Sequence, residues 1–196
     1  VAPFGIYPVF LMKLLCFALF ACAFNLLLGY AGLLSFGHAA FLATGGYITG
    51  FVLTEYSGLS TELGILAGTA ASALLGLGFG LLAIRRQGIY FAMITLALAQ
   101  LVFFMFMQSS FTGGENGLQG VPRGHLFGFI DLKDNLNMYY FVLAVFVFGF
   151  LLIQRTIHSP YGQVLKAIRE NEPRAISLGY NVDAHKLLAF VLSAAL

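Results

Sequence analysis

The spacing of the charged residues constrains this chain more than any other feature, because it leaves long stretches without a formal charge. Four of these stretches are at least as long as a membrane crossing: Leu14–Thr54, Leu63–Ile84, Gln87–Gly114 and Asn135–Gln154. The hydrocarbon core of a bilayer is about 30 Å thick and is crossed by about 20 helical residues. The first stretch is long enough for two crossings, and each of the others for one.

The composition points the same way, since 60% of the residues are hydrophobic and only 9% are charged. A soluble domain carries about 25% charged residues, and the five spans that these stretches would form cannot all be interior to a soluble protein of this length. The sequence therefore predicts an all-α, polytopic membrane protein with at least five to six transmembrane helices. The expected spans are Phe10–Leu28, Leu34–Leu53, Leu63–Ile84, Gly88–Met107, Met138–Gln154 and one that starts near Lys186.

The chain begins with Val1 and ends inside the apolar run Leu187–Leu196. We therefore expect residues 1–196 to form a single transmembrane domain that is part of a longer protein.

The cations are distributed unevenly between the connections that join these spans. Seven cations fall on one side: Arg85, Arg86, Arg155, Lys166, Arg169, Arg174 and Lys186. The opposite side has three: Lys13, Arg123 and Lys133. Lys and Arg are enriched in cytoplasmic loops, so the side with seven cations is predicted to be cytoplasmic.

Small residues recur at every fourth position of two spans. They are Gly46 and Gly50 in the second span, and Gly64, Gly68, Ser72, Gly76 and Gly80 in the third. This spacing places small side chains on one helix face and lets membrane helices approach closely. It indicates tight packing within the chain, with a dimerisation face as the alternative.

Several neutral polar residues fall inside the predicted spans: Asn25, Ser35, His38, Thr44, Thr95 and Gln100. Unpaired polar groups are costly in lipid, so we expect these side chains to face the bundle interior, where they could line a solute pathway. For His38, a hydrogen bond between helices is the alternative. No acidic residue lies in a span, which argues against a proton relay. We see no catalytic set, metal-ligand spacing or phosphate-binding loop, and so predict no enzyme activity, cofactor or metal.

The polar segment 155–186 is predicted to form two short helices on the basic side. Ser159 followed by Pro160 is typical of a helix start, and Gly179 of a helix end. Asn171–Pro173 should break the segment between the two helices, and Asp183 could cap the next span. The short apolar faces favour docking into a protein groove, with a lipid-surface role as the alternative.

Four stretches of the chain resemble the permease subunits of branched-chain amino-acid ABC importers, specifically the second of their two paired permeases. These stretches are Asn25–Phe41, Arg86–Leu96, Thr112–Leu118 with Pro122, and Ser159–Glu172 followed by Gly179, Lys186 and Phe190. Taken together they extend over most of the chain.

This resemblance implies a transport subunit in the bacterial inner membrane, without catalytic activity of its own. Its partners would be a second permease, two cytoplasmic ATPases and an extracytoplasmic solute-binding protein that delivers leucine, isoleucine or valine. The residues matching the loop that docks on an ATPase are Glu170, Asn171, Glu172, Ala175 and Gly179. Alternatives are a permease for urea, short amides or another small solute, and a channel or carrier that needs no ATPase.

Overall fold

A computed structural model of the chain describes residues 8–55, 60–86, 88–109, 112–114, 117–118, 120–121, 125–126, 130–131 and 134–196. Most of the expected outer loop, including Pro122, lies outside these residues. The elements are α1 (Pro8–Asn25), η1 (Leu26–Ala31), α2 (His38–Glu55), α3 (Thr61–Ala83), α4 (Ile89–Gln108), β1 (His125–Leu126), β2 (Ile130–Asp131), α5 (Asn135–Ile157), α6 (Pro160–Glu170), α7 (Glu172–Ser177) and α8 (Val182–Ala195).

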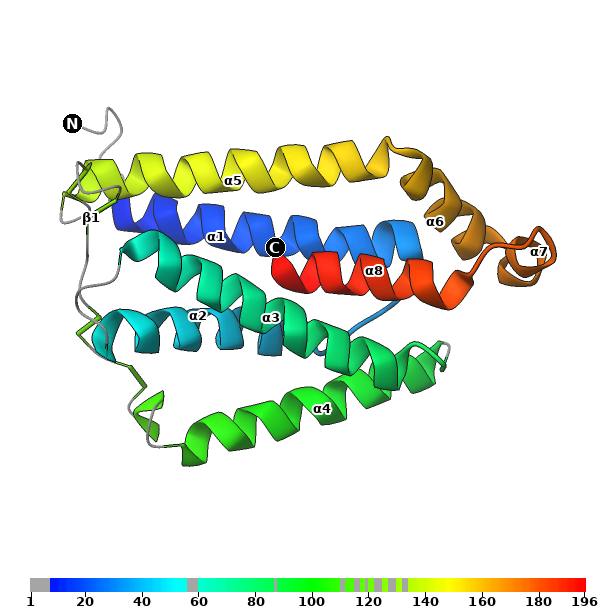
Figure 1. Cartoon of the computed structure of the whole chain (residues 1–196), viewed down its shortest axis with the longest axis horizontal. Helices are drawn as coiled ribbons and strands as arrows, with labels where there is room; N and C mark the ends of the chain where they lie inside the picture. Colours follow the sequence, from blue (N-terminus) through cyan, green and yellow to red (C-terminus); the bar gives the residue numbers. More distant parts are fainter. Residues whose placement is uncertain are drawn as a thin grey trace.

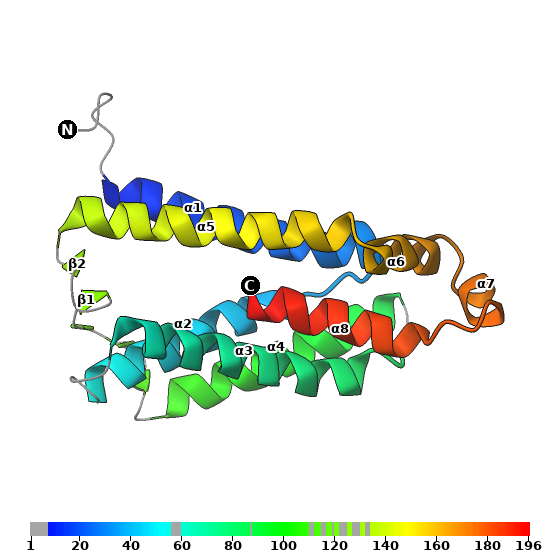
Figure 2. The same cartoon turned by 45° about the horizontal axis from the view of Figure 1, so that its top comes forward.

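The long helices lie in two groups that run along a common axis. Helices α1 and α5 lie side by side in one group, and α2, α3, α4 and α8 form the other (Figures 1 and 2). The short helices α6 and α7 project at one end of the bundle, and the antiparallel pair β1–β2 lies at the opposite end. This arrangement places the polar segment that includes α6 and α7 away from the end of α2, the start of α3 and the β1–β2 pair.

Four helical segments of the described chain are long and apolar enough to cross a membrane: Pro8–Ala31, Thr61–Ala83, Ile89–Gln108 and Asn135–Ile157. They confirm the prediction of an all-α polytopic membrane protein. Helix α2 does not meet these criteria, because it carries His38 at its start and Glu55 at its end. Helix α8 has 14 residues. Membrane crossings by these two helices therefore stay predictions.

The second span differs from the expectation, because its helix begins at His38 and not near Leu34. Helix α1 continues into the π-helical turn η1 and ends at Gly32, whose φ of 71° is a left-handed conformation that favours glycine. Residues 33–35 then have no regular secondary structure, and Phe36 and Gly37 form a turn before α2. An added Cβ at Gly37 would lie 2.8 Å from the carbonyl oxygen of Thr95 in α4. The chain therefore packs closely against α4 at the residues where the first turn of the second span was expected.

Hydrogen bonds hold this non-helical segment, which comprises residues 32–37. The amide of Phe36 donates to Thr95 Oγ1 at 3.2 Å, and the amide of Gly37 donates to Ser35 Oγ at 3.2 Å. The amide of Leu33 donates back to the carbonyl of Leu27 at 3.2 Å. Contacts with α4 and η1 therefore position the start of α2.

The small residues of α3 form one buried stripe that faces two different helices. All five predicted positions are buried: Gly64, Gly68, Ser72, Gly76 and Gly80. The first three face α2, where Ser72 Oγ donates to the carbonyl of Phe41 at 2.9 Å. The last two face α8: an added Cβ at Gly76 would lie 2.5 Å from Ala194 Cβ, and one at Gly80 would lie 2.5 Å from Leu187 Cδ1.

On α2 the close approach is made by Gly45, and the expected packing role of Gly46 is wrong. A Cβ at Gly45 would lie 2.9 Å from Ser72 Oγ, whereas Gly46 is exposed and has no atom within 4 Å of that position. Adjacent residues of a helix point in directions about 100° apart, so only one of the two can face α3. Gly50 is buried, but it lies near Leu118 and not against α3.

Candidate functional site

Helix α6 begins with the cap that the sequence predicts. Ser159 Oγ accepts a hydrogen bond from the amide of Gly162, and Pro160 occupies the first turn. Leu165 and Ile168 are buried on one face of α6, and Ile168 packs with Ala175 of α7 and Val182 of α8. The two short helices are therefore attached to the bundle through an apolar contact with the start of α8.

Asn171 forms the bend between α6 and α7, as expected from its position before Glu172 and Pro173. Its backbone is extended, and its Oδ1 accepts a hydrogen bond from the amide of Arg174 at 3.1 Å. The side chain thus caps α7 at its first turn. Asn171 is one of the residues predicted to dock on an ATPase, and its side-chain oxygen accepts a hydrogen bond within the loop itself.

Gly179 follows the end of α7 and has a φ of 87°, which confirms its predicted place as a helix stop. The amide of the next residue, Tyr180, donates to the carbonyl of Ala175 at 3.2 Å and closes the last turn. Asn181 then caps α8 through a hydrogen bond from the amide of Ala184 at 3.2 Å. The prediction that Asp183 caps this helix is wrong, since Asp183 lies inside the first turn.

Glu172 and Lys186 form an ion pair that connects α7 to α8. The distance between Glu172 Oε2 and Lys186 Nζ is 2.7 Å, and the side chains are 21% and 4% exposed. The Glu172 carboxylate is therefore paired within the chain. The sequence analysis did not predict Lys186 as its partner. Of the other predicted docking residues, Ala175 is buried and Glu170 is exposed.

Three apolar side chains are exposed at the end of α7 and directly after it. Ile176, Leu178 and Tyr180 are 58%, 67% and 43% exposed, and we call them the α7 apolar patch. The sequence analysis did not single out these residues, although apolar side chains in an otherwise polar segment were a usable signal. A patch of this kind, at the tip of the molecule, is suited to contact another protein.

Cationic side chains lie at the same end of the molecule as α6 and α7. Lys166 Nζ lies 5.4 Å from the centroid of the Tyr30 ring, and the guanidinium of Arg169 donates to the carbonyl of Gly29. Arg85, after α3, lines a shallow pocket together with Asn181 at the start of α8. These contacts bring η1 together with the two cationic connections that the charge distribution had assigned to one side.

Tyr161 attaches the start of α6 to the start of α8. Its hydroxyl donates to the carbonyl of His185 at 2.8 Å, and its ring stacks on the His185 ring with 5.7 Å between centroids. Burial raises the pKa of Tyr161, because the phenolate would lose its hydration. The phenol therefore stays protonated and remains a hydrogen-bond donor.

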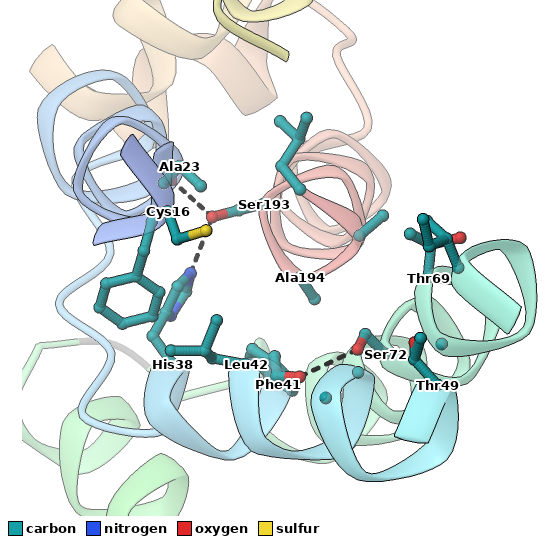
Figure 3. Close-up of a pocket in the computed structure, with 17 residues that line it drawn as sticks. Cys16, Ala23, His38, Phe41, Leu42, Thr49, Thr69, Ser72, Ser193 and Ala194 are labelled. Carbon is teal, nitrogen blue, oxygen red and sulfur yellow. Dashed lines mark hydrogen bonds between the residues drawn. The ribbon is translucent and has the colours of Figure 1, made fainter. Parts of the chain in front are cut away.

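His38 is the buried polar residue at the start of α2, and it connects three helices (Figure 3). Its Nε2 lies 2.7 Å from Ser193 Oγ of α8, and Ser193 Oγ lies 2.6 Å from the carbonyl oxygen of Ala23 in α1. A hydroxyl has one proton, and the carbonyl of Ala23 can only accept it. Ser193 therefore accepts from His38 Nε2–H, which leaves Nδ1 as an acceptor. The ring centroids of Phe24 and Phe41 each lie 5.4 Å from the centroid of the His38 ring.

A cavity of about 170 Å³ lies beside this network, between α1, α2, α3 and α8 (Figure 3). Its lining is mostly apolar, and the hydroxyl of Ser72, which also lines it, donates to the carbonyl of Phe41. His38 Nδ1 has no hydrogen-bond partner within the described part of the chain. This nitrogen is itself buried, so the cavity presents a mostly apolar surface.

The other predicted pathway residues fall into two classes. Ser35, Thr44 and Thr95 are buried, and each makes a hydrogen bond inside the chain: Thr44 Oγ1 donates to the carbonyl of Ala40 at 2.7 Å, and Thr95 accepts from the Phe36 amide. Asn25 and Gln100 are exposed, and Asn25 lines a pocket with Lys166 and Arg169. The structure therefore does not bring these residues together in one site. Among the described residues, no three His, Cys, Asp or Glu side chains are grouped as a metal site would require.

Comparison with known proteins adds a family to this geometry. The model of the branched-chain amino acid transport system permease component matches residues 8–196. The chain belongs to this permease family. The match extends over every described element, including the non-helical segment 32–37 before α2 and the α6–α7 loop.

Two curated relatives are permease proteins named LivM, of the high-affinity branched-chain amino acid transport system. The protein from Escherichia coli (strain K12) is 33% identical over an alignment that covers 87% of this chain and 45% of the relative. The protein from Salmonella typhimurium is 30% identical over an alignment with the same two coverages. The chain thus spans about half the length of the curated relatives that it matches. No solved structure matches the chain.

Proposed function

We propose that this permease chain is the membrane-spanning part of an importer subunit that moves branched-chain amino acids across the bacterial inner membrane. Residues 1–196 would form one part of the transmembrane domain, with residues 155–186 as its cytoplasmic coupling loop. The chain would hydrolyse no ATP itself. Its partners would be a second permease, two cytoplasmic ABC ATPases and an extracytoplasmic solute-binding protein. The family and the names of the two relatives support the solute class.

The observation that carries this proposal is the construction of the α6–α7 loop. Its tip presents the α7 apolar patch, and its base is attached to α8 by the ion pair between Glu172 and Lys186. A carrier that works without an ATPase does not require such a loop. An exposed apolar surface on a well-attached short helix is suited to receive force from a separate protein.

The contacts of α8 suggest how that force would reach the membrane helices. Helix α8 packs against Gly76 and Gly80 of α3, and its Ser193 bonds both His38 at the start of α2 and the carbonyl of Ala23 in α1. A displacement of α7 would therefore move α8 and, through these contacts, the helices around the interior. Rigid shifts of packed helices are a usual means of switching access.

The experiment compares two charge insertions in the full-length permease, assembled with its partners. Leu178→Glu places a carboxylate in the α7 apolar patch, and Gln163→Glu places one on the exposed side of α6. We expect Leu178→Glu to reduce ATPase co-purification and ATP-driven leucine uptake at least tenfold, and Gln163→Glu to leave both within twofold. The amount of permease in the membrane should be unchanged in both variants.

Normal ATPase co-purification and uptake in Leu178→Glu would contradict the docking assignment. Equal leucine transport without any ATPase would instead indicate a channel or carrier. Uptake of urea or short amides in place of leucine, isoleucine and valine would retain the importer but change its solute.

A further inference from the structure

Helix α6 lies beside the end of α1, and two of its cations contact the π-helical turn η1 (Figure 1). Lys166 Nζ lies 5.4 Å from the centroid of the Tyr30 ring, and the Arg169 guanidinium donates to the carbonyl of Gly29. An ammonium group has three N–H donors and a guanidinium has five. Contact with η1 therefore positions both cations and leaves most of their donors for another partner.

A pocket of about 600 Å³ opens between η1 and α6. Its lining residues are Asn25, Gly29, Tyr30, Lys166, Arg169 and Glu170. Two cations and one carboxylate give this lining a net charge of +1, and no ion pair within the described residues joins Glu170 to either cation. The pocket therefore matches a ligand that carries a single negative charge.

The depth of this pocket follows from the apolar segment that ends beside it. The segment Pro8–Ala31 has 24 residues, which cover about 36 Å at about 1.5 Å each, whereas the hydrocarbon core is about 30 Å thick. Gly29 and Tyr30, near the end of this segment, would therefore lie at the edge of the hydrocarbon. Tyr, Lys and Arg are the side chains that anchor membrane proteins at this level, where the phospholipid headgroups begin.

Asn25 supplies a further polar group, about one turn of helix deeper than Gly29. Its side chain is exposed, and its amide makes no hydrogen bond in the part of the chain that the structure describes. Gly29 leaves room for this amide, because an added Cβ there would lie 2.8 Å from Asn25 Oδ1. An amide without a partner is unfavourable near hydrocarbon, and the phosphate and ester oxygens of a phospholipid can accept its N–H groups.

We propose that this pocket binds the headgroup of an anionic phospholipid, with Lys166 and Arg169 holding its phosphate and Asn25 donating to the oxygens below it. Charge-assisted hydrogen bonds to phosphate are strong, and basic pockets between membrane helices bind anionic headgroups. One phosphodiester balances the net charge of the lining, whereas a zwitterionic headgroup brings a second positive charge. The site shares no residue with the α7 apolar patch, so it goes beyond the proposed function.

The experiment measures lipid binding to the full-length permease, assembled with its partners in detergent, by native mass spectrometry. The probes are phosphatidylglycerol, which is anionic, phosphatidylcholine, which is zwitterionic, and inorganic phosphate. Lys166→Gln and Arg169→Gln each remove one cation from the pocket. Arg85→Gln and Arg86→Gln are the matched controls, because these exposed cations lie at the same end of the bundle and outside the pocket.

We expect one phosphatidylglycerol to bind at least tenfold more tightly than phosphatidylcholine. Lys166→Gln and Arg169→Gln should each weaken this binding at least fivefold, and the two controls should change it less than twofold. Equal losses in all four variants, or unchanged binding in Lys166→Gln and Arg169→Gln, would overturn the site. Equal binding of the two lipids would overturn the requirement for an anionic headgroup, and inorganic phosphate binding as tightly as phosphatidylglycerol would overturn the lipid as the ligand.

Two variants are used because Arg169 also holds η1 through the Gly29 carbonyl. Lys166 makes no hydrogen bond within the described chain, so Lys166→Gln decides the result if Arg169→Gln does not assemble. The measurement requires neither ATP nor a transported solute. Selective lipid binding in a permease that works without an ATPase would contradict the proposed function and still support this inference.

Discussion

Lys186 lies at the start of α8 with 4% of its side chain exposed, and its ammonium group is 2.7 Å from the Glu172 carboxylate. A charge buried to this degree needs a partner, because its hydration has been removed. The pair joins the beginning of α7 to the beginning of α8, across the bend that contains Gly179. At the scale of single residues, this contact has the largest consequence for the geometry of the loop.

We expect Glu172→Gln to loosen α7 from the bundle. Removing one partner of a buried ion pair costs about 3 kcal/mol when the other charge stays buried, and the lower end of the range applies because Glu172 is partly exposed. The population of the opened loop would rise up to about 100-fold, and tryptic cleavage after Arg174 in α7 should accelerate accordingly.

Two further variants serve as controls for this prediction. Glu170→Gln removes a carboxylate that is exposed at the end of α6 and should leave the cleavage rate unchanged. Glu172→Gln combined with Lys186→Met removes both charges and should restore most of the protection. Equal cleavage rates in Glu172→Gln and Glu170→Gln would show that the ion pair does not hold the loop.

At the scale of elements, α3 is the helix on which the second group is built. Its buried stripe meets α2 through Gly64, Gly68 and Ser72, and α8 through Gly76 and Gly80. Lipid offers no hydrophobic drive for helix association, so close backbone packing has to supply the stability. The stripe can serve two partners because α2 begins at His38, part-way along the bundle, and α8 occupies the space beside the second half of α3.

We predict that Gly76→Leu prevents stable folding and that Gly78→Leu does not. A Cβ at Gly76 would lie 2.5 Å from Ala194 Cβ, which forces α3 and α8 apart, whereas Gly78 has no atom within 4 Å of that position. Overpacking of this kind costs about 1–3 kcal/mol or more. The yield of monodisperse protein in detergent, compared between these two leucine variants of one helix, measures the effect. Similar yields would contradict a packing role for the stripe.

At the scale of the whole molecule, the seven cations predicted to be cytoplasmic belong to elements that meet at one end of the bundle. Helices α6 and α7, the π-helical turn η1 and the turn after α3 lie together there, and the end of α2 and the start of α3 lie at the other end (Figure 1). Positive residues are retained on the cytoplasmic side of membranes, which gives this end its proposed orientation.

We expect thiols at Arg86 and Ser177 to face the same side of the membrane, opposite a thiol at Ser60. Arg86 follows α3, Ser177 ends α7, and Ser60 precedes α3 at the other end. In a background without cysteine, an impermeant maleimide should label Arg86→Cys and Ser177→Cys in inside-out vesicles, and Ser60→Cys in right-side-out vesicles. Labelling of Arg86→Cys and Ser177→Cys from opposite sides would rule out this topology.

Much of this architecture could be predicted from local sequence. The charge spacing predicted the long helices to within a few residues at most ends, and Ser159, Asn171 and Gly179 predicted the ends of the short helices. These features depend on residues that are close along the chain, where hydropathy, capping and glycine conformation act directly. The candidate site was less accessible, because several predicted pathway residues turned out to be hydrogen-bonded inside the chain.

The sequence by itself determined that this chain is a helical membrane protein with a polar, twice-capped loop on its basic side, because those properties follow from apolar length and from neighbouring residues. Only the tertiary structure decided that the helix of the second span begins at His38, that Gly45 and not Gly46 meets α3, and that Glu172 pairs with Lys186. Each of these outcomes depends on a partner far along the chain, such as Thr95 for the Phe36 amide. No local pattern contains the position of such a partner, since the packing of the helices brings the two together.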